Sequence, residues 1–246
     1  MIEQFHRPAT VREALALKRR LRARAAFLAG GTWLNSSECP RPPEQCISLA
    51  GLDLARIELM RSHVSIGALC TVQQVVEDRK VPGPLRAAAA QIASRNVRNM
   101  ATLGGHVAAH VPHSDLIPML IALEARLSLA GVSGASRNLT VERYLVRPVP
   151  GLVTRILVPR LAAGRVAACR NLRASSNSRS IVSAAVSLSL VRGAVRDPIL
   201  ALGGIEDRAL RLGVVERSLD GKLLPSLDVI QSLVERAVRP GASLAG

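Results

Sequence analysis

Aromatic residues are nearly absent from this chain: they make up 2% of its 246 residues, as one Trp, one Tyr and two Phe. Proteins that bind single-stranded nucleic acid stack bases on aromatic side chains, so this scarcity argues against that function. The formal net charge of +15 would otherwise suggest it. Lysine is scarce too, because only Lys18, Lys80 and Lys222 stand among the 33 basic residues, and the arginines are scattered. We therefore expect no nucleic-acid partner.

Cysteine is also sparse, and no pair follows the C-x-x-C pattern of zinc or iron–sulfur ligands. The four residues are Cys39, Cys46, Cys70 and Cys169. We expect free thiols in a reducing cytoplasm. A secretory leader is not expected, because the start MIEQFHRP lacks an apolar stretch. A membrane span is not expected either, because the longest uncharged run, 180–191, is too short to cross a bilayer.

Three histidines have the spacing of one helical face, which would suit a metal. They are His106, His110 and His113. The preceding glycine pair and Pro112 argue against a continuous helix through them. We therefore expect no metal site.

Two small-residue turns are the strongest candidates for a ligand site. An apolar run ends at Gly30-Gly31, and a second glycine pair stands at Gly104-Gly105. Glycine lets the backbone approach a ligand and presents N–H groups to an anion, so each turn suits a phosphate or pyrophosphate. Asp115 follows the second turn and would offer its carboxylate to a sugar or polyol hydroxyl. A glycine pair alone is also typical of an ordinary turn, so the interpretation requires both turns to meet at one ligand.

Both turns carry longer motifs that resemble a known family. The segments AGGTWLN and RNMATLGGHVAAHVPHSDLIP are similar to the FAD-binding (medium) subunit of the molybdenum hydroxylases, of the xanthine dehydrogenase and carbon monoxide dehydrogenase type. The resemblance covers nearly the whole chain. It implies an α+β fold, with a two-part FAD-binding domain of the PCMH/vanillyl-alcohol-oxidase-like type followed by a short α+β C-terminal domain. The implied units are 1–55, 56–165 and 166–246, the last lacking its final helix.

The resemblance also implies a function and a site. The expected protein is a xanthine dehydrogenase-like, FAD-dependent oxidoreductase subunit, which passes electrons from iron–sulfur clusters in a partner subunit to FAD and on to an acceptor such as NAD. A molybdopterin subunit would hydroxylate the substrate, so no catalytic residue is expected in this chain. The two turns are expected to hold the FAD pyrophosphate, with His106 and Asp115 serving ribityl or ribose hydroxyls. The full expected cofactor site is Phe27, Leu28, Ala29, Gly30, Gly31, Thr32, Trp33, Leu34, Thr102, Leu103, Gly104, Gly105, His106 and Asp115.

Departures from the family pattern leave alternatives open. His106 stands where the family usually has asparagine, and no lysine stands near Arg170, where the family carries one close to the flavin. A flavin-free scaffold homologue is therefore one alternative, and a basic nucleic-acid-binding module is another. Residues 239–246 stop before a helix that the family carries, which implies an exposed apolar strip on 181–191 and 198–202.

Hydrophobic periodicity predicts the order of the elements. Thr10 is expected to cap a helix over 11–22. The other expected helices are 71–78, 84–94, 115–125, 212–218 and 225–238. The expected strands are 25–29, 46–49, a hairpin over 57–66, 127–130, 152–158, 166–172, 181–191 and 198–202.

Overall fold

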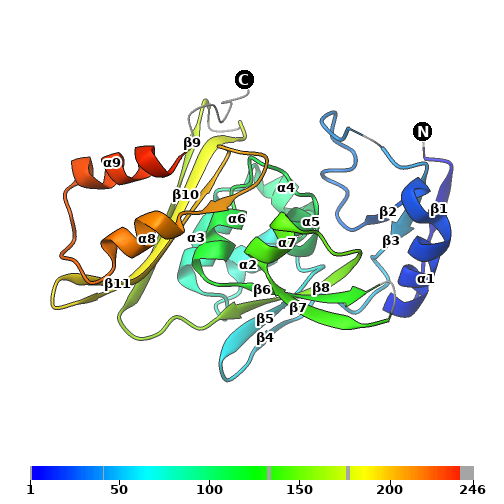
Figure 1. Ribbon diagram of the computed structural model, residues 1–246. Helices are drawn as coiled ribbons and strands as arrows, with labels where there is room; N and C mark the ends of the chain where they lie inside the picture. Colours follow the sequence, from blue (N-terminus) through cyan, green and yellow to red (C-terminus); the bar gives the residue numbers. More distant parts are fainter. Residues whose placement is uncertain (1, 41, 132–133, 176–177, 239–246) are drawn as a thin grey trace.

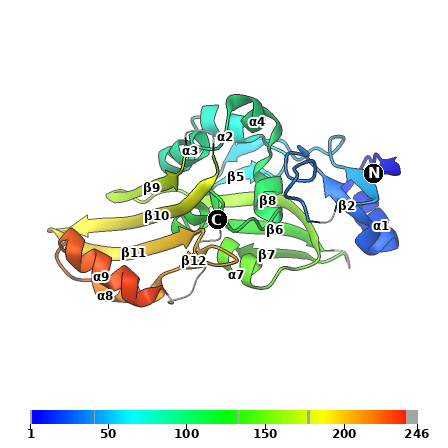
Figure 2. The ribbon, with the colours of Figure 1, turned by 90° about the horizontal axis from the view of Figure 1, so that it is seen from above.

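The computed structural model describes residues 2–40, 42–131, 134–175 and 178–238. Its strands form three sheets that follow one another along the chain. Figures 1 and 2 show the resulting row of units, with the N-terminal sheet at one end and the last strands and helices at the other. We propose the units 1–55, 56–165 and 166–246, because these boundaries lie in or next to the connections between sheets.

The N-terminal unit is a small parallel sheet covered by one helix. Its strands pair in the order β1-β3-β2, and α1 connects β1 to β2. Thr10 caps α1, because its hydroxyl accepts the N–H of Glu13. The buried face of this helix carries Ala14 and Leu15. The expected helix and two strands are confirmed, and the three-residue β1 is an addition. The elements are β1 (Gln4–His6), α1 (Val11–Leu21), the 3-10 helix η1 (Arg22–Arg24), β2 (Ala25–Leu28) and β3 (Gln45–Ser48).

The middle unit is an antiparallel sheet in the order β4-β5-β8-β6-β7, with helices packed on one face (Figure 1). The expected hairpin over 57–66 is confirmed as β4 and β5. The elements are β4 (Ile57–Leu59), β5 (His63–Gly67), α2 (Val72–Glu77), α3 (Gly83–Ala90), α4 (Arg95–Met100), α5 (Leu103–Ala108), α6 (Ile117–Ala122), β6 (Arg126–Gly131), β7 (Ser136–Thr140), α7 (Val141–Val146) and β8 (Gly151–Pro159).

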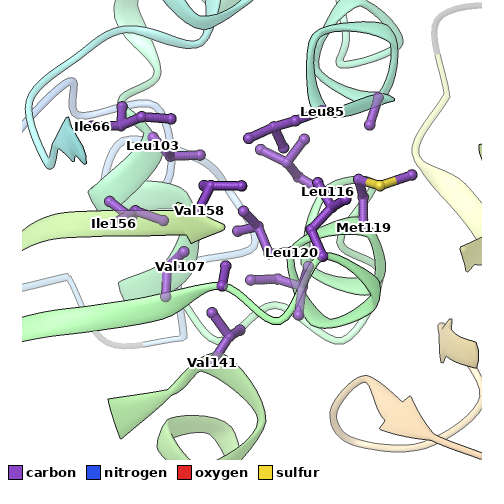
Figure 3. Packing of buried hydrophobic residues seen from close by; sticks show 14 of the residues in the cluster. Ile66, Leu85, Leu103, Val107, Leu116, Met119, Leu120, Val141, Ile156 and Val158 are labelled. Carbon is purple, nitrogen blue, oxygen red and sulfur yellow. The ribbon is translucent and has the colours of Figure 1, made fainter. Parts of the chain in front are cut away.

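The largest core lies between this sheet and its helices (Figure 3). Leu103 of α5, Leu120 of α6 and Ile156 of β8 are all fully buried in it. Burying one such side chain stabilises the fold by about 1.5–3 kcal/mol. The core therefore fixes α5, and the segment that leads into it, against the sheet.

Two short helices near the second glycine turn were not expected. Ser94 caps α4 and Thr102 caps α5, because each hydroxyl accepts an N–H three residues further on. Helix α6 is shorter than the predicted 115–125 helix, since Pro118 lies in its first turn, where proline is tolerated. As expected, no continuous helix joins the three histidines: α5 ends at Ala108, and His110 has a φ of 52°.

The C-terminal unit is an antiparallel sheet in the order β12-β11-β10-β9, with α8 and α9 packed on it (Figure 2). The expected exposed strip at 198–202 is wrong, because Leu200 and Leu202 pack against the core formed with these helices. In β10, Leu190 and Val191 are about half exposed. Residues 239–246 lie outside the described residues. The elements are β9 (Arg165–Arg173), β10 (Ser180–Val191), β11 (Ala194–Gly203), β12 (Leu210–Arg211), α8 (Gly213–Leu219) and α9 (Leu227–Ala237).

Candidate functional site

A cleft of about 540 Å³ lies where the three units meet. Its walls come from the loop after β2, the start of α5, the loop before α6 and the end of the β9–β10 hairpin. Every expected site residue lines it except Leu28 and Leu103. Its volume lies in the range of about 300–1,000 Å³ that is usual for cofactor sites.

The loop after β2 presents free backbone donors to this cleft. Gly31 has a φ of 72°, and the N–H of Asn35 donates to the Gly31 carbonyl at 3.0 Å, which closes a single helical turn. Within the described part of the chain, the N–H groups from Gly30 to Leu34 have no hydrogen-bond acceptor. Successive free N–H groups around a positive-φ glycine form a concave site for an anion such as a pyrophosphate.

The two glycine turns touch one another. A Cβ built on Gly30 would lie 1.7 Å from the carbonyl oxygen of Met100, so only glycine fits there. On the other side, a Cβ on Gly105 would lie 3.8 Å from the Cβ of Ala29. The structure therefore brings together two segments that are about 70 residues apart in the sequence.

The second turn does not expose consecutive N–H groups, and this part of the expectation is wrong. The N–H of Leu103 donates to the Cys70 carbonyl, and that of Gly104 to the Ala68 carbonyl, both at 2.9 Å. The N–H of Gly105 donates to the Thr102 hydroxyl at 3.1 Å. A Cβ on Gly104 would lie 2.5 Å from that of Ala68. Gly104 therefore allows close packing of α5 on the end of β5.

His106 is held by a hydrogen bond inside the protein. Its Nε2 lies 2.7 Å from the hydroxyl of Ser114, which also accepts the N–H groups of Leu116 and Ile117 at the start of α6. Burial lowers the pKa of His106, although the nearby Asp115 carboxylate opposes this effect. The imidazole is therefore neutral at neutral pH.

Asp115 connects the middle unit to the C-terminal unit. Its Oδ2 forms an ion pair with Arg173 at 3.0 Å, and its Oδ1 accepts the hydroxyl of Ser180. Arg173 also donates to the carbonyl of Gln91 at the end of α3. The two charged side chains are only 12% and 15% exposed. Asp115 therefore positions the β9–β10 hairpin at the edge of the cleft, and sequence reasoning missed its partner Arg173.

Several further lining residues were not expected. The guanidinium of Arg179 lies 5.4 Å from the ring centre of Trp33 and forms an ion pair with Glu38. Lys18 donates to two carbonyls that follow α1, and burial lowers its pKa. Tyr144 lines the cleft from α7. The signal that sequence reasoning overlooked is aromatic scarcity, because Phe27, Trp33 and Tyr144 are three of only four aromatic residues.

Fold and cleft together define a class of protein: an α+β domain that binds an elongated dinucleotide cofactor, with aromatic walls for flat rings and free N–H groups for a pyrophosphate. In the described residues, no helix has both the length and the hydropathy needed to cross a membrane.

Comparisons with known proteins give the family. The model of the "FAD binding domain in molybdopterin dehydrogenase" matches residues 1–161. Escherichia coli K12 has a relative named "Uncharacterized protein YgfM", 36% identical over 100% of this chain and 89% of the relative. The carbon monoxide dehydrogenase medium chain of Afipia carboxidovorans is 28% identical over 98% of this chain and 88% of the relative. A solved carbon monoxide dehydrogenase structure from Hydrogenophaga pseudoflava aligns with a TM-score of 0.92 at 27% identity, over 100% of this chain and 90% of the other.

The chain therefore belongs to the family of FAD-binding medium subunits of the molybdenum hydroxylases, and its cofactor is FAD. The expected fold class and cofactor are confirmed.

Proposed function

We propose that this chain is an electron-transfer subunit, which holds FAD between iron–sulfur clusters in one partner subunit and a final acceptor such as NAD. A molybdopterin subunit of the same complex would oxidise the substrate, in an enzyme of the xanthine or carbon monoxide dehydrogenase type. The observation that carries this proposal is the cleft itself, which residues 30–34, whose N–H groups have no acceptor among the described residues, line together with Phe27, Trp33 and Tyr144. Four free cysteines suit a location in the cytoplasm.

FAD, when bound, supplies the capacity to take up electrons and pass them on. The chain contributes binding and orientation. The turn at Gly30 to Leu34 donates to the pyrophosphate, while Gly105, which has no side chain, leaves room for it beside Ala29. Trp33 offers a flat apolar wall.

The two polar residues near the second turn act in different ways. The second imidazole nitrogen of His106, Nδ1, has no hydrogen-bond partner among the residues that the structure describes, and we assign it to a cofactor hydroxyl. Asp115 acts mainly by holding Arg173 and Ser180 in place, and it retains lone pairs for a cofactor hydroxyl.

The test is electron transfer between purified subunits without oxygen. The FAD-loaded chain is mixed with the reduced iron–sulfur subunit of the proposed complex, and the flavin absorbance is followed after rapid mixing. We expect the flavin to be reduced in one fast phase, and then reoxidised when NAD or another acceptor is added. A flavin that stays oxidised while the two subunits form a stable complex would contradict the proposed role.

A further inference from the structure

A second hollow, the N-terminal groove, lies between β1 and α1 and has a volume of about 740 Å³. One of its walls is the segment from Phe5 to Pro8, and the other is the face of α1 that carries Ala16, Leu17 and Arg20. Because β1 is an edge strand, the groove lies at the border of its sheet. Figures 1 and 2 show this unit at one end of the molecule. The groove shares no lining residue with the cleft, so it is a separate surface.

Apolar side chains in the groove remain open to solvent. Phe5 is 46% exposed, and across from it Ala16 is exposed and Leu17 is half-buried. The guanidinium of Arg7 lies 5.4 Å from the ring centre of Phe5. An apolar surface with a polar rim is typical of a contact with another protein.

The rim of the groove carries an excess of positive charge, supplied by Arg7, Arg19 and Arg20. All 18 acidic residues of the sequence lie in the part of the chain that the structure describes, and none of them forms an ion pair with these three arginines. Glu13 also lines the groove, and its Oε2 accepts the N–H of Ala9 at 2.9 Å. The dipole of α1 explains basic residues at the end of that helix, but it does not explain Arg7 on the opposite wall.

Charge and shape together select the kind of partner. Arginine binds carboxylates through paired hydrogen bonds, so three arginines without acidic partners suit an acidic ligand. The apolar surface requires an apolar side chain, which the phosphodiester backbone of a nucleic acid lacks. A concave groove also gives little contact with a flat membrane surface. A segment of a protein that combines acidic and apolar side chains meets all of these conditions.

We propose that the N-terminal groove binds an acidic segment of a partner protein. The carboxylates of this segment pair with Arg7, Arg19 and Arg20. An apolar side chain between them covers Phe5 and Leu17. The groove lies outside the FAD site, so this inference does not depend on the proposed function.

The test uses the labelled peptide EELEE with blocked ends, titrated with the full chain and followed by fluorescence polarisation. The variant is Arg20→Glu, and the control is Arg137→Glu, which makes the same change of net charge at an exposed residue of β7 outside the groove. We expect Arg20→Glu to weaken binding at least about tenfold, because it removes a charge-assisted hydrogen bond and adds repulsion. The control should bind the peptide as the wild type does. An FAD titration of each variant shows whether the fold is intact.

A second peptide, EESEE, tests the apolar contact. The wild type should bind EELEE more tightly than EESEE, and Phe5→Ala should remove most of this difference, since the leucine then loses its contact.

Several results would overturn the proposal. These are no binding of EELEE to the wild type, an equal effect of Arg20→Glu and Arg137→Glu, and equal affinities of the wild type for the two peptides. A single-stranded oligonucleotide that displaces EELEE and binds more tightly, in a manner that Arg20→Glu abolishes, would make the groove a nucleic-acid site instead.

Discussion

Replacing Gly30 with alanine should force apart the two turns that form the cleft. The added Cβ would lie 1.7 Å from the carbonyl oxygen of Met100 and 2.6 Å from its carbonyl carbon. Both are backbone atoms of the segment that leads into α5, so no side chain can rotate away. The turns must separate by about 1 Å or more, and overpacking of this kind costs about 1–3 kcal/mol of stability. The same shift displaces the free N–H groups, so FAD binding should weaken at least about tenfold, or ~1.4 kcal/mol.

The assay pairs urea denaturation with FAD titration of the wild type and two variants. Gly83→Ala is the matched control, because a Cβ on Gly83 meets nothing within 4 Å. We expect the control to retain both the stability and the affinity of the wild type. Equal free energies of unfolding and equal affinities for FAD in Gly30→Ala and Gly83→Ala would contradict this role of Gly30.

Other predictions follow from single contacts. Asp115→Asn should lower the free energy of unfolding by about 2 kcal/mol, because it removes the carboxylate charge from a largely buried ion pair with Arg173. A urea denaturation curve of the variant that coincides with that of the wild type would contradict this. Leu103→Ala should lower the free energy of unfolding by about 2–5 kcal/mol, because it leaves a cavity in the core, whereas Leu34→Ala should mainly reduce the affinity for FAD. A larger loss of stability in Leu34→Ala, with a larger loss of FAD affinity in Leu103→Ala, would reject both assignments. Stability should fall as the pH drops below about 6.5, because burial lowers the pKa of His106 in the fold and the unfolded chain takes up its proton first. His106→Asn should reduce this pH dependence in urea titrations at about pH 7.5 and 5.5, and an unchanged dependence would exclude His106 as a cause.

Much of the fold was predictable from regular patterns. The helix at 11–22, the hairpin at 57–66 and the long strand at 181–191 all form close to their expected bounds. Each of these segments buries apolar residues at the period of its own secondary structure, so local sequence specifies it. The short helices α4 and α5 were missed, because six residues with glycine or asparagine give no clear period.

The site was predictable in its location and only partly in its chemistry. Residue 104 must be glycine because a side chain there would collide with Ala68, 36 residues earlier. In the sequence, a glycine needed for packing looks the same as one that faces a ligand. Asp115 pairs with Arg173, 58 residues later, and nothing in the local pattern of either residue reveals the other. Such contacts depend on how the units pack together.

The most direct test of the account is an FAD titration followed by the fluorescence of Trp33. Trp33 is the only tryptophan in the sequence and lines the cleft, so its emission reports on that site alone. We expect FAD to quench the emission of Trp33, with the quenching saturating at one FAD per chain. No binding, or FAD binding that leaves the Trp33 emission unchanged, would contradict an FAD site in this cleft.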